Sequence, residues 1–394
     1  MISVSQAQDA IIESITTGTE TTVSLTESLG CVAVEDIYCP IDAPPFNQSG
    51  VDGYAFRLDN YKEGHHIHIA GESSAGKSYV KKLVPNQAVR IFTGAEVPDG
   101  ADTVVMQEKI SIHGDLLIIH DEKIAHGANV RERGSHSKKG DLALPRGSVI
   151  NAGTIGFLAS IGISKVKVFS KPSIVIIITG NELRQPGETL SSGQVYECNS
   201  ACLCSALQGM GISEVKVFYA ADDESATRTV FREALSIADI VLFTGGISVG
   251  DYDYVGKVLR EENVNEIFYK VKQRPGKPLF FGKKDGHIIF GLPGNPASVL
   301  TCFYEYVYPA IRSTMGYTNP LLQSIRVPLT HQVNTVNGLT FFLKANTDYS
   351  SVTSLDGQPS YMMRSFAAAN CFIVVPEDTE RINAGEVVEV HLLP

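Results

Sequence analysis

The order of apolar and polar positions changes along the chain and is clearest in its middle third. Continuous apolar runs end near residues 180, 220 and 246, and two segments with helical spacing, 199–210 and 224–237, separate them. Strands that are apolar on both faces are typical of a parallel sheet covered by helices on both sides. The pattern therefore predicts an α/β domain with a parallel sheet from residue 171 onward.

Short strands dominate on both sides of this region. Residues 47–130 and 319–394 contain short apolar stretches broken by Gly, Pro and Asp, with little helical periodicity. They predict a β-rich insert domain and a small all-β domain at the C-terminal end, which we expect to be a β-barrel. Residues 4–15 predict a short amphipathic helix, and residues 131–170 predict mixed structure with a helix in TIGFLASIG.

Composition narrows the class of protein. The 394 residues are 43% hydrophobic, enough for several cores, and the net charge of -10 argues against nucleic acid as the main partner. The chain has no signal-like start and no run of about 18 apolar residues, so we expect a cytoplasmic protein without a membrane partner. The seven cysteines show no CxxC spacing. We expect reduced thiols, with Cys198, Cys202 and Cys204 on a buried helix face rather than in a metal site.

Glycine-rich polar turns follow three of the predicted strands. In an open parallel sheet a ligand binds beyond the carboxyl ends of the strands, so three such turns predict one shared small-molecule site. The candidate residues in these turns are Glu182, Gly245, Gly246, Ser248, Gly250, Asp253, Pro293, Gly294, Asn295 and Pro296.

The third turn, GLPGNP, has the chemistry of an anion site. Asn295 is a good N-cap and Pro296 suits the first helical position, so we expect the helix to begin at Ala297. Gly291 and Gly294 allow a close approach of the backbone, and the N–H groups of a first helical turn attract phosphate. An ordinary strand-to-helix connection without a ligand would have the same pattern.

A basic stretch without any acid lies between the second and third turns. Its members are Lys270, Lys272, Arg274, Lys277, Lys283 and Lys284. They fit a solvated hairpin with protective edge lysines, or a patch in which Lys270, Arg274 and Lys277 neutralise a phosphorylated ligand. Carboxylates beside a phosphate site, here Glu182 and Asp253, often hold a divalent ion.

GESSAGKS at 71–78 matches the letters of a nucleotide-binding P-loop. That motif needs a long helix from its lysine, yet Pro85 interrupts any helix there and the surrounding pattern is β-rich. We reject this interpretation.

Six motifs, in order, carry a resemblance that covers essentially the whole chain. They are PPFNQSGVDGYAFR, RIFTGAEVPDGADTVVMQE, VIIITGNELRQPGETLSSGQVYECNS, DIVLFTGGISVGDYDYV, KQRPGKPLFFG and GLPGNPAS. With them the chain resembles the molybdopterin molybdenumtransferase family, to which the C-terminal domain of gephyrin also belongs.

The resemblance implies a multidomain α/β plus β architecture in an elongated, four-domain protomer. Its parts are a linking domain of residues 21–46 and 131–170, a β-rich domain of 47–130, an α/β molybdopterin-binding domain of 1–20 and 171–318, and a β-barrel domain of 319–394. It also implies a homodimer in which Asp52 and Thr93 of one subunit face Glu182 and Asp253 of the other.

The implied reaction is insertion of molybdate into adenylylated molybdopterin with release of AMP. The turns with Ser248 would bind the substrate, while Lys270, Arg274 and Lys277 would bind phosphate or molybdate. Glu182 and Asp253, with Asp52 as a further ligand, would hold Mg²⁺, which polarises the pyrophosphate. Without the resemblance, the favoured interpretation of Asp52 is an Asx turn, and that of Thr93 is a strand-end cap.

Three motifs depart from the family pattern, at four positions. Ser135 and His136 stand where two acids are common, Asn181 where an aspartate is frequent, and Arg274 in place of a usual lysine. A metal or acid role at the first of these positions is therefore in doubt, and His136 remains a candidate ligand or proton carrier. Two other function classes stay open: a hydrolase of a nucleotide-like pyrophosphate and a gephyrin-like scaffold.

Overall fold

The computed structural model describes residues 1–61, 66–247 and 254–394 and separates into two compact units. Unit 1 consists of Met1–Thr22, Leu29–Val34 and Lys167–Pro394, and unit 2 of Val23–Ser28 and Glu35–Val166. Two of the four passages of the chain between the units fall within β1 (Glu20–Ser24) and β12 (Lys165–Phe169).

A six-stranded sheet forms the centre of unit 1, in the order β16-β13-β17-β21-β20-β18. The first four strands are parallel to one another. β20 pairs antiparallel with both of its neighbours, β21 and β18. Their bounds are β13 Ile174–Thr179, β16 Val215–Ala220, β17 Ile240–Thr244, β18 Asn265–Tyr269, β20 Phe280–Lys284 and β21 His287–Leu292. Every residue of β13 and β17 is buried, as expected for strands covered on both faces. The predicted parallel-sheet α/β domain is confirmed.

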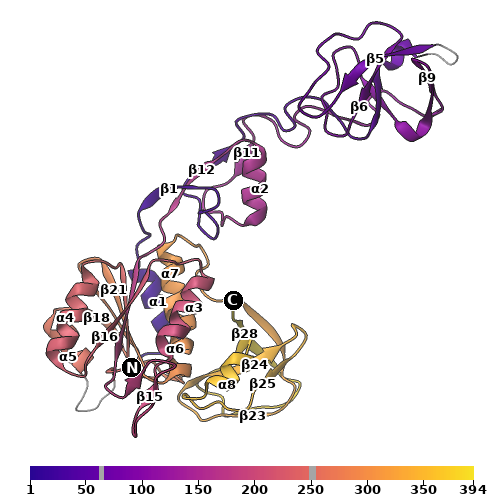
Figure 1. Ribbon diagram of the computed structural model, residues 1–394. Helices are drawn as coiled ribbons and strands as arrows, with labels where there is room; N and C mark the ends of the chain where they lie inside the picture. Colours follow the sequence, from indigo (N-terminus) through magenta and orange to yellow (C-terminus); the bar gives the residue numbers. More distant parts are fainter. Residues whose placement is uncertain (62–65, 248–253) are drawn as a thin grey trace. The chain divides into compact units, whose positions relative to one another are not determined.

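Helices cover both faces of this sheet (Figure 1). On one side, α4 (Glu224–Leu235) and α5 (Tyr254–Glu261) pack on the odd positions of the strands, with Phe231 and Val258 in the core. On the other side lie α1 (Val4–Ser14), α3 (Asn199–Gly209), α6 (Pro296–Cys302) and α7 (Tyr308–Thr314). The helices predicted near 4–15, 199–210 and 224–237 are therefore present.

A π-helical turn, Phe303–Val307, joins α6 to α7. Pro309 lacks the N–H that would bond to the Glu305 carbonyl in a regular helix. That carbonyl instead accepts a hydrogen bond from Gln8 Nε2 of α1 at 3.4 Å. The irregular turn thus gives α1 a polar anchor in the core.

The last part of unit 1 is a second sheet, in the order β19-β24-β26-β28-β22, with β25 on β24. The bounds are β19 Gln273–Arg274, β22 Ser324–Pro328, β24 Thr340–Thr347, β25 Val352–Ser354, β26 Cys371–Val375 and β28 Val387–Leu392. A separate pair joins β23 (Val333–Asn334) to β27 (Arg381–Ile382), and α8 spans Met363–Ala368. Because β19 pairs with β24, Arg274 lies opposite Phe341 in this second sheet.

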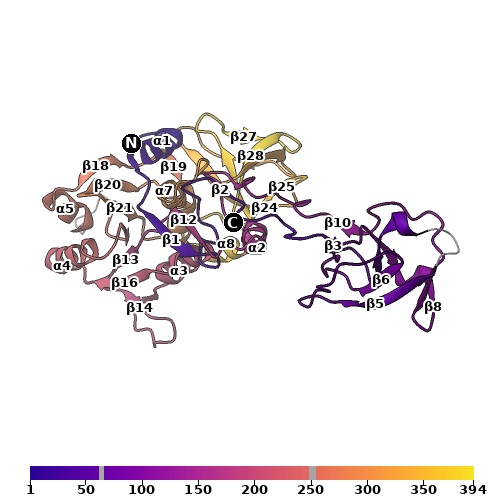
Figure 2. The same cartoon turned by 90° about the horizontal axis from the view of Figure 1, so that it is seen from above.

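The first residues of the chain are held beside the basic stretch. Ile2 donates its N–H to the Lys270 carbonyl at 3.2 Å, and its own carbonyl accepts from Lys272 N–H at 2.8 Å. Figure 2 shows the N-terminus near the end of β18, in agreement with these two bonds.

Unit 2 contains a six-stranded, mainly antiparallel sheet in the order β7-β4-β6-β5-β9-β8. The bounds are β4 Gly53–Phe56, β5 Ile67–Ser73, β6 Gln87–Ile91, β7 Thr103–Met106, β8 Ile110–His113 and β9 Leu116–Ile119. The P-loop-like segment runs along β5 into a tight turn in which Ser74 and Lys77 pair, and no helix follows Lys77. The rejection of a P-loop is confirmed.

The rest of unit 2 has little regular structure. Two short antiparallel pairs join β2 (Ile37–Tyr38) to β11 (Leu142–Leu144) and β3 (Gln48–Ser49) to β10 (Val130–Arg131). The helix predicted in TIGFLASIG is α2 (Ala152–Ser160), capped by the Asn151 side chain. The four-part division of the chain and its boundaries remain a prediction.

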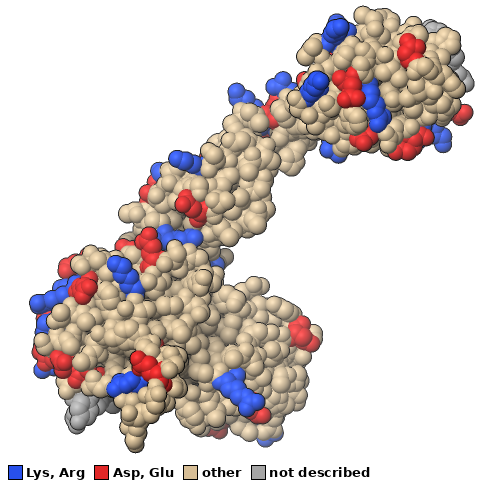
Figure 3. Space-filling model, viewed as in Figure 1, with Lys and Arg blue, Asp and Glu red and all other residues tan. Residues whose placement is uncertain are grey.

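Charged side chains are mixed over the surface, but Cys198, Cys202 and Cys204 do not form the buried helix face that was expected, because the buried side chains of α3 are Asn199, Leu203 and Leu207. On the face seen in Figure 3, basic and acidic side chains are interspersed over both units. All seven cysteines are free, and burial raises the pKa of the Cys202 thiol to about 11. Cys198, Cys202 and Cys204 are half-buried, and the described residues contain no cluster of three metal-ligating side chains. Within the described chain, helices that combine the length and apolarity needed to cross a membrane are absent.

Candidate functional site

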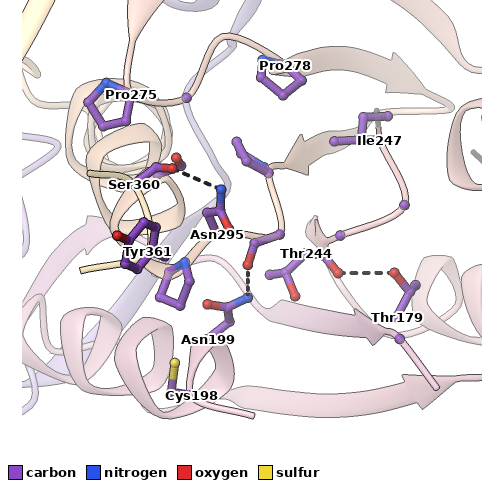
Figure 4. A pocket seen from close by; sticks show the side chains of 18 of the residues that line it. Thr179, Cys198, Asn199, Thr244, Ile247, Pro275, Pro278, Asn295, Ser360 and Tyr361 are labelled. Carbon is purple, nitrogen blue, oxygen red and sulfur yellow. Dashed lines mark hydrogen bonds between the residues drawn. The ribbon is translucent and has the colours of Figure 1, made fainter. Parts of the chain in front are cut away.

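A pocket of about 1150 Å³ lies at the carboxyl ends of β13, β17 and β21 in unit 1 (Figure 4). This is where the strand order reverses, since β16 and β17 flank β13 on opposite sides. Such a switch point leaves a crevice between the loops of neighbouring strands. The pocket therefore stands where the sequence placed a small-molecule site.

The three glycine-rich turns meet in this pocket. Thr179 Oγ1 donates to the Thr244 carbonyl at 3.2 Å, and a Cβ added to Gly245 would lie 3.0 Å from that same Oγ1. A Cβ on Gly294 would lie 3.7 Å from the Gly245 Cα. Gly245 and Gly246 have φ values of 84° and 62°, which side chains rarely adopt. The glycines thus allow the turns to approach one another closely.

The turn before α6 differs from its prediction in one respect. The helix begins at Pro296, one residue before the expected start, and Asn295 makes no side-chain capping bond. Asn295 Nδ2 instead donates to Ser360 Oγ at 2.9 Å, while the Ser360 carbonyl accepts from Ala297 N–H at 3.0 Å. Asn295 therefore occupies the predicted N-cap position, but its side chain binds a residue distant in sequence instead of the first helical turn.

The basic stretch divides into groups with different contacts. Arg274 and Lys277 line the pocket, and the Arg274 guanidinium lies 5.9 Å from the Phe341 ring centre. Lys270 is not among the lining residues; its ammonium lies 4.8 Å from the Tyr269 ring centre.

Three other lysines of this stretch have structural partners. Lys272 pairs with Glu377 at 3.6 Å, Lys284 pairs with Asp285 at 3.5 Å, and Lys283 donates to the Ser14 carbonyl at 2.6 Å. The structure therefore brings two of the three proposed phosphate-binding cations to the pocket.

Among the residues that the structure describes, three carboxylates line the pocket: Glu182, Glu197 and Asp222. Glu182 Oε2 lies 2.9 Å from the position of a Cβ on Gly180. Glu197 is buried and accepts from Ser200 N–H at 2.8 Å and from the Ser200 hydroxyl. Asp222 and Asn181 bind each other through their backbone N–H groups, at 3.1 and 3.3 Å.

The described carboxylates are compatible with Mg²⁺ when a bound substrate supplies some of the ligands. Mg²⁺ needs as few as one or two carboxylates when phosphates and water complete its shell, and Glu182 meets that need. The proposed ligand Asp253, like Ser248 and Gly250, lies outside the described residues.

Asp52 and Thr93 form a compact pair in unit 2. Asp52 Oδ1 accepts from both the backbone N–H and the hydroxyl of Thr93, each at 2.8 Å. These two bonds, helped by the charge of Arg90, lower the pKa of the Asp52 carboxyl. Thr93 thus keeps Asp52 ionised and oriented. His136, also in unit 2, packs edge-on against Phe157 with ring centres 5.4 Å apart.

The prediction missed two groups of pocket residues. The first is Asn199 at the start of α3, whose Nδ2 donates to the Gly294 carbonyl at 3.0 Å. The second is the loop Gly357–Met362 of the second sheet, of which Gln358, Pro359, Ser360 and Tyr361 line the pocket. Asn199 belongs to the motif that ends in YECNS, so the sequence contained a signal for it. No local sequence pattern marks the loop as part of the site.

Three family models match successive parts of the chain. Residues 2–162 match the MoeA N-terminal region (domain I and II), residues 175–313 match a probable molybdopterin binding domain, and residues 326–393 match the MoeA C-terminal region (domain IV).

Curated relatives extend over the same length. A molybdopterin molybdenumtransferase of Haemophilus influenzae is 34% identical, with all of both chains covered. One of Staphylococcus epidermidis is 33% identical over 99% of this chain and 95% of its own length. The crystal structure of a molybdopterin biosynthesis MoeA protein from Pyrococcus horikoshii is 32% identical, with a TM-score of 0.81 over 100% of this chain and 99% of that chain.

These matches define the class as enzymes of molybdenum cofactor biosynthesis, with a multidomain α/β plus β fold. The chain belongs to the molybdopterin molybdenumtransferase family. The expectations of this family and of a transferase are confirmed.

Proposed function

We propose that the protein inserts molybdate into adenylylated molybdopterin and releases AMP in a Mg²⁺-dependent reaction. The observation that carries the proposal is the pocket, in which three glycine-rich turns, Arg274 and Lys277 surround one cavity in a chain of this family. A phosphorylated substrate needs backbone donors and cations in such an arrangement.

The described pocket residues would bind the substrate through two kinds of group, backbone turns and cationic side chains. Gly245, Gly246 and the Pro293–Pro296 turn offer close backbone approach to the substrate, and Arg274 and Lys277 offer charge for phosphate or for molybdate, a tetrahedral dianion. The substrate's own phosphoanhydride supplies the driving force, so the protein needs to position charges rather than provide a nucleophile.

Glu182, which lines the pocket, is the first candidate ligand for Mg²⁺, with Asp253 and Asp52 as further candidates. When bound, the ion would polarise the pyrophosphate and favour departure of AMP. By holding the ion, Glu182 would also help to orient the bound pyrophosphate.

We further propose that the protein is a homodimer in which Asp52 and Thr93 of one subunit complete the pocket of the other. The family resemblance supports this proposal, together with the ionised, oriented state of Asp52. The cytoplasm remains the expected compartment.

AMP release tests the proposal directly. Purified protein is incubated with adenylylated molybdopterin, molybdate and Mg²⁺, and AMP is followed by chromatography with Glu182→Gln as the control variant. We expect release that depends on both molybdate and Mg²⁺. Release without molybdate would identify a pyrophosphate hydrolase, and binding without any release would identify a scaffold; either result contradicts the proposal.

A further inference from the structure

The loop Gly357–Met362 is held to β24 by a buried lysine. Lys344 is 1% exposed, and its ammonium donates to the carbonyl oxygens of Gly357 at 2.8 Å, Met362 at 2.9 Å and Pro359 at 3.4 Å. Burial lowers the pKa of Lys344. Burying a cation among neutral acceptors costs desolvation free energy. A role for Lys344 in positioning the loop would account for that cost.

Two side chains of the region reinforce the same loop. The Gln358 amide exchanges hydrogen bonds with the Lys344 backbone, accepting from its N–H at 3.0 Å and donating to its carbonyl at 2.9 Å. Ser365 Oγ donates to the Gly357 carbonyl at 2.6 Å. The loop is therefore preorganised on the second sheet before any ligand arrives.

The far side of the loop faces the pocket. Ser360 binds Asn295 and Ala297 at the start of α6, which fixes the loop against the GLPGNP turn. The next residue, Tyr361, lines the pocket and is 65% exposed (Figure 4). An exposed tyrosine on an anchored loop at the edge of a ligand pocket is suited to stacking, because its ring offers a large flat face and has only two side-chain torsions to fix on contact.

We infer that Tyr361 stacks on a flat heteroaromatic ring of the ligand and that Lys344 is the positioning residue that holds it there. This inference rests on the proposed function, under which the ligand contains two such rings, a pterin and an adenine. Stacking requires only a π-face, and this is the chemistry the two rings share.

A fluorescence experiment can separate the two rings. The chain contains no tryptophan, so Tyr361→Trp introduces a single reporter at the pocket. The probes are AMP, pterin-6-carboxylate and ribose 5-phosphate, which has a phosphate but no aromatic ring. We expect AMP or the pterin to quench the indole in a saturable way, and ribose 5-phosphate to have no effect.

Tyr219→Trp is the matched control. Tyr219 is 52% exposed but does not line the pocket, so its indole should respond to none of the probes in the same range. Equal quenching in both variants, or no quenching of Tyr361→Trp by either ring at millimolar concentration, overturns the inference.

Calorimetry on unlabelled protein provides a second test. Tyr361→Ala should raise the Kd of the stacked probe about tenfold, whereas Tyr361→Phe should keep it near the wild-type value. An unchanged Kd in Tyr361→Ala overturns the inference even if the tryptophan variant misfolds.

A double variant tests the role of Lys344. Lys344→Met should also raise the Kd, and adding it to Tyr361→Ala should have little further effect, because both changes remove one contact. Fully additive losses would show that Lys344 only stabilises the fold. These binding results are independent of AMP release, so failure of the stacking inference and failure of the proposed reaction are distinguishable.

Discussion

Asn199 Nδ2 donates to the carbonyl oxygen of Gly294 at 3.0 Å and so joins the first residue of α3 to the turn before α6. Asn199 is 8% exposed, and the bond is at least partly shielded from water. The bond fixes the position of Gly294 relative to the other two turns of the pocket.

Replacing Asn199 by Ala should therefore affect binding more than stability. Loss of one such hydrogen bond costs roughly 1 kcal/mol of unfolding free energy, while the freed Gly294 carbonyl should raise KM several-fold. Asn370→Ala is the control, because Asn370 makes comparable bonds to the Thr347 backbone, at 2.9 Å each, away from the pocket. Urea unfolding and steady-state kinetics measure the two effects; equal KM changes in both variants would contradict the assignment.

Two glycines of the pocket should respond differently to alanine. Gly245 has φ 84°, and a Cβ there would lie 3.0 Å from Thr179 Oγ1, so Gly245→Ala should cost roughly 1–3 kcal/mol of stability and most of the turnover. Gly294 lacks a positive φ, and the nearest atom to an added Cβ is 3.7 Å away. Gly294→Ala should fold normally. The comparison fails if thermal unfolding and AMP release rank the two variants in the opposite order.

Subunit mixing can test the proposed shared site. Asp52→Ala and Glu182→Gln should each be nearly inactive as pure dimers. A mixed dimer would contain one site with both changes and one intact site, and should recover roughly half of the wild-type activity. Differently tagged subunits allow the mixed species to be isolated and its AMP release measured. Isolated mixed dimers without activity would place Asp52 and Glu182 in the same subunit's site, and an active pure Asp52→Ala dimer would exclude Asp52 from the site.

The His391 region predicts a specific pH dependence. His391 Nδ1 lies 2.9 Å from Glu305 Oε1 and its Nε2 lies 3.3 Å from Glu389 Oε1. Burial acts to lower the pKa of His391, but the two carboxylates outweigh it and raise the pKa above its ordinary value of 6.5.

The stabilisation from this raised pKa is fully present below 6.5 and is lost as the pH rises through the folded-state pKa. The difference in urea midpoint between wild type and His391→Gln should accordingly be larger near about pH 5.5 than near about pH 9. A constant difference would show that His391 does not gain a proton on folding.

Local patterns predicted the sheet and most of the pocket. The strands β13 and β17 are uninterrupted apolar runs followed by glycine, and these signals depend only on neighbouring residues. The same reasoning placed Glu182, Gly245 and Gly294 at one edge of the sheet, where the structure has them lining one cavity.

Contacts between distant segments could not be predicted in this way. Asn295 stands at the N-cap position of α6, but its side chain donates a hydrogen bond to Ser360, 65 residues away, instead of capping the helix. Lys344 follows the apolar run Phe341–Leu343 in β24, and only the folded loop explains its burial. Lys270 and Arg274 belong to one basic stretch, yet the pairing of β19 with β24 directs Arg274 to the pocket lining while Lys270 lies by Tyr269.

The two hydrogen bonds of Ile2 have a practical consequence for handling the protein. Because Ile2 bonds to Lys270 and Lys272, in the segment that leads into β19 and Arg274, a tag placed ahead of Met1 would lie beside that segment. Comparing the activity of tagged and tag-free protein is therefore a sensible first step in any enzymology.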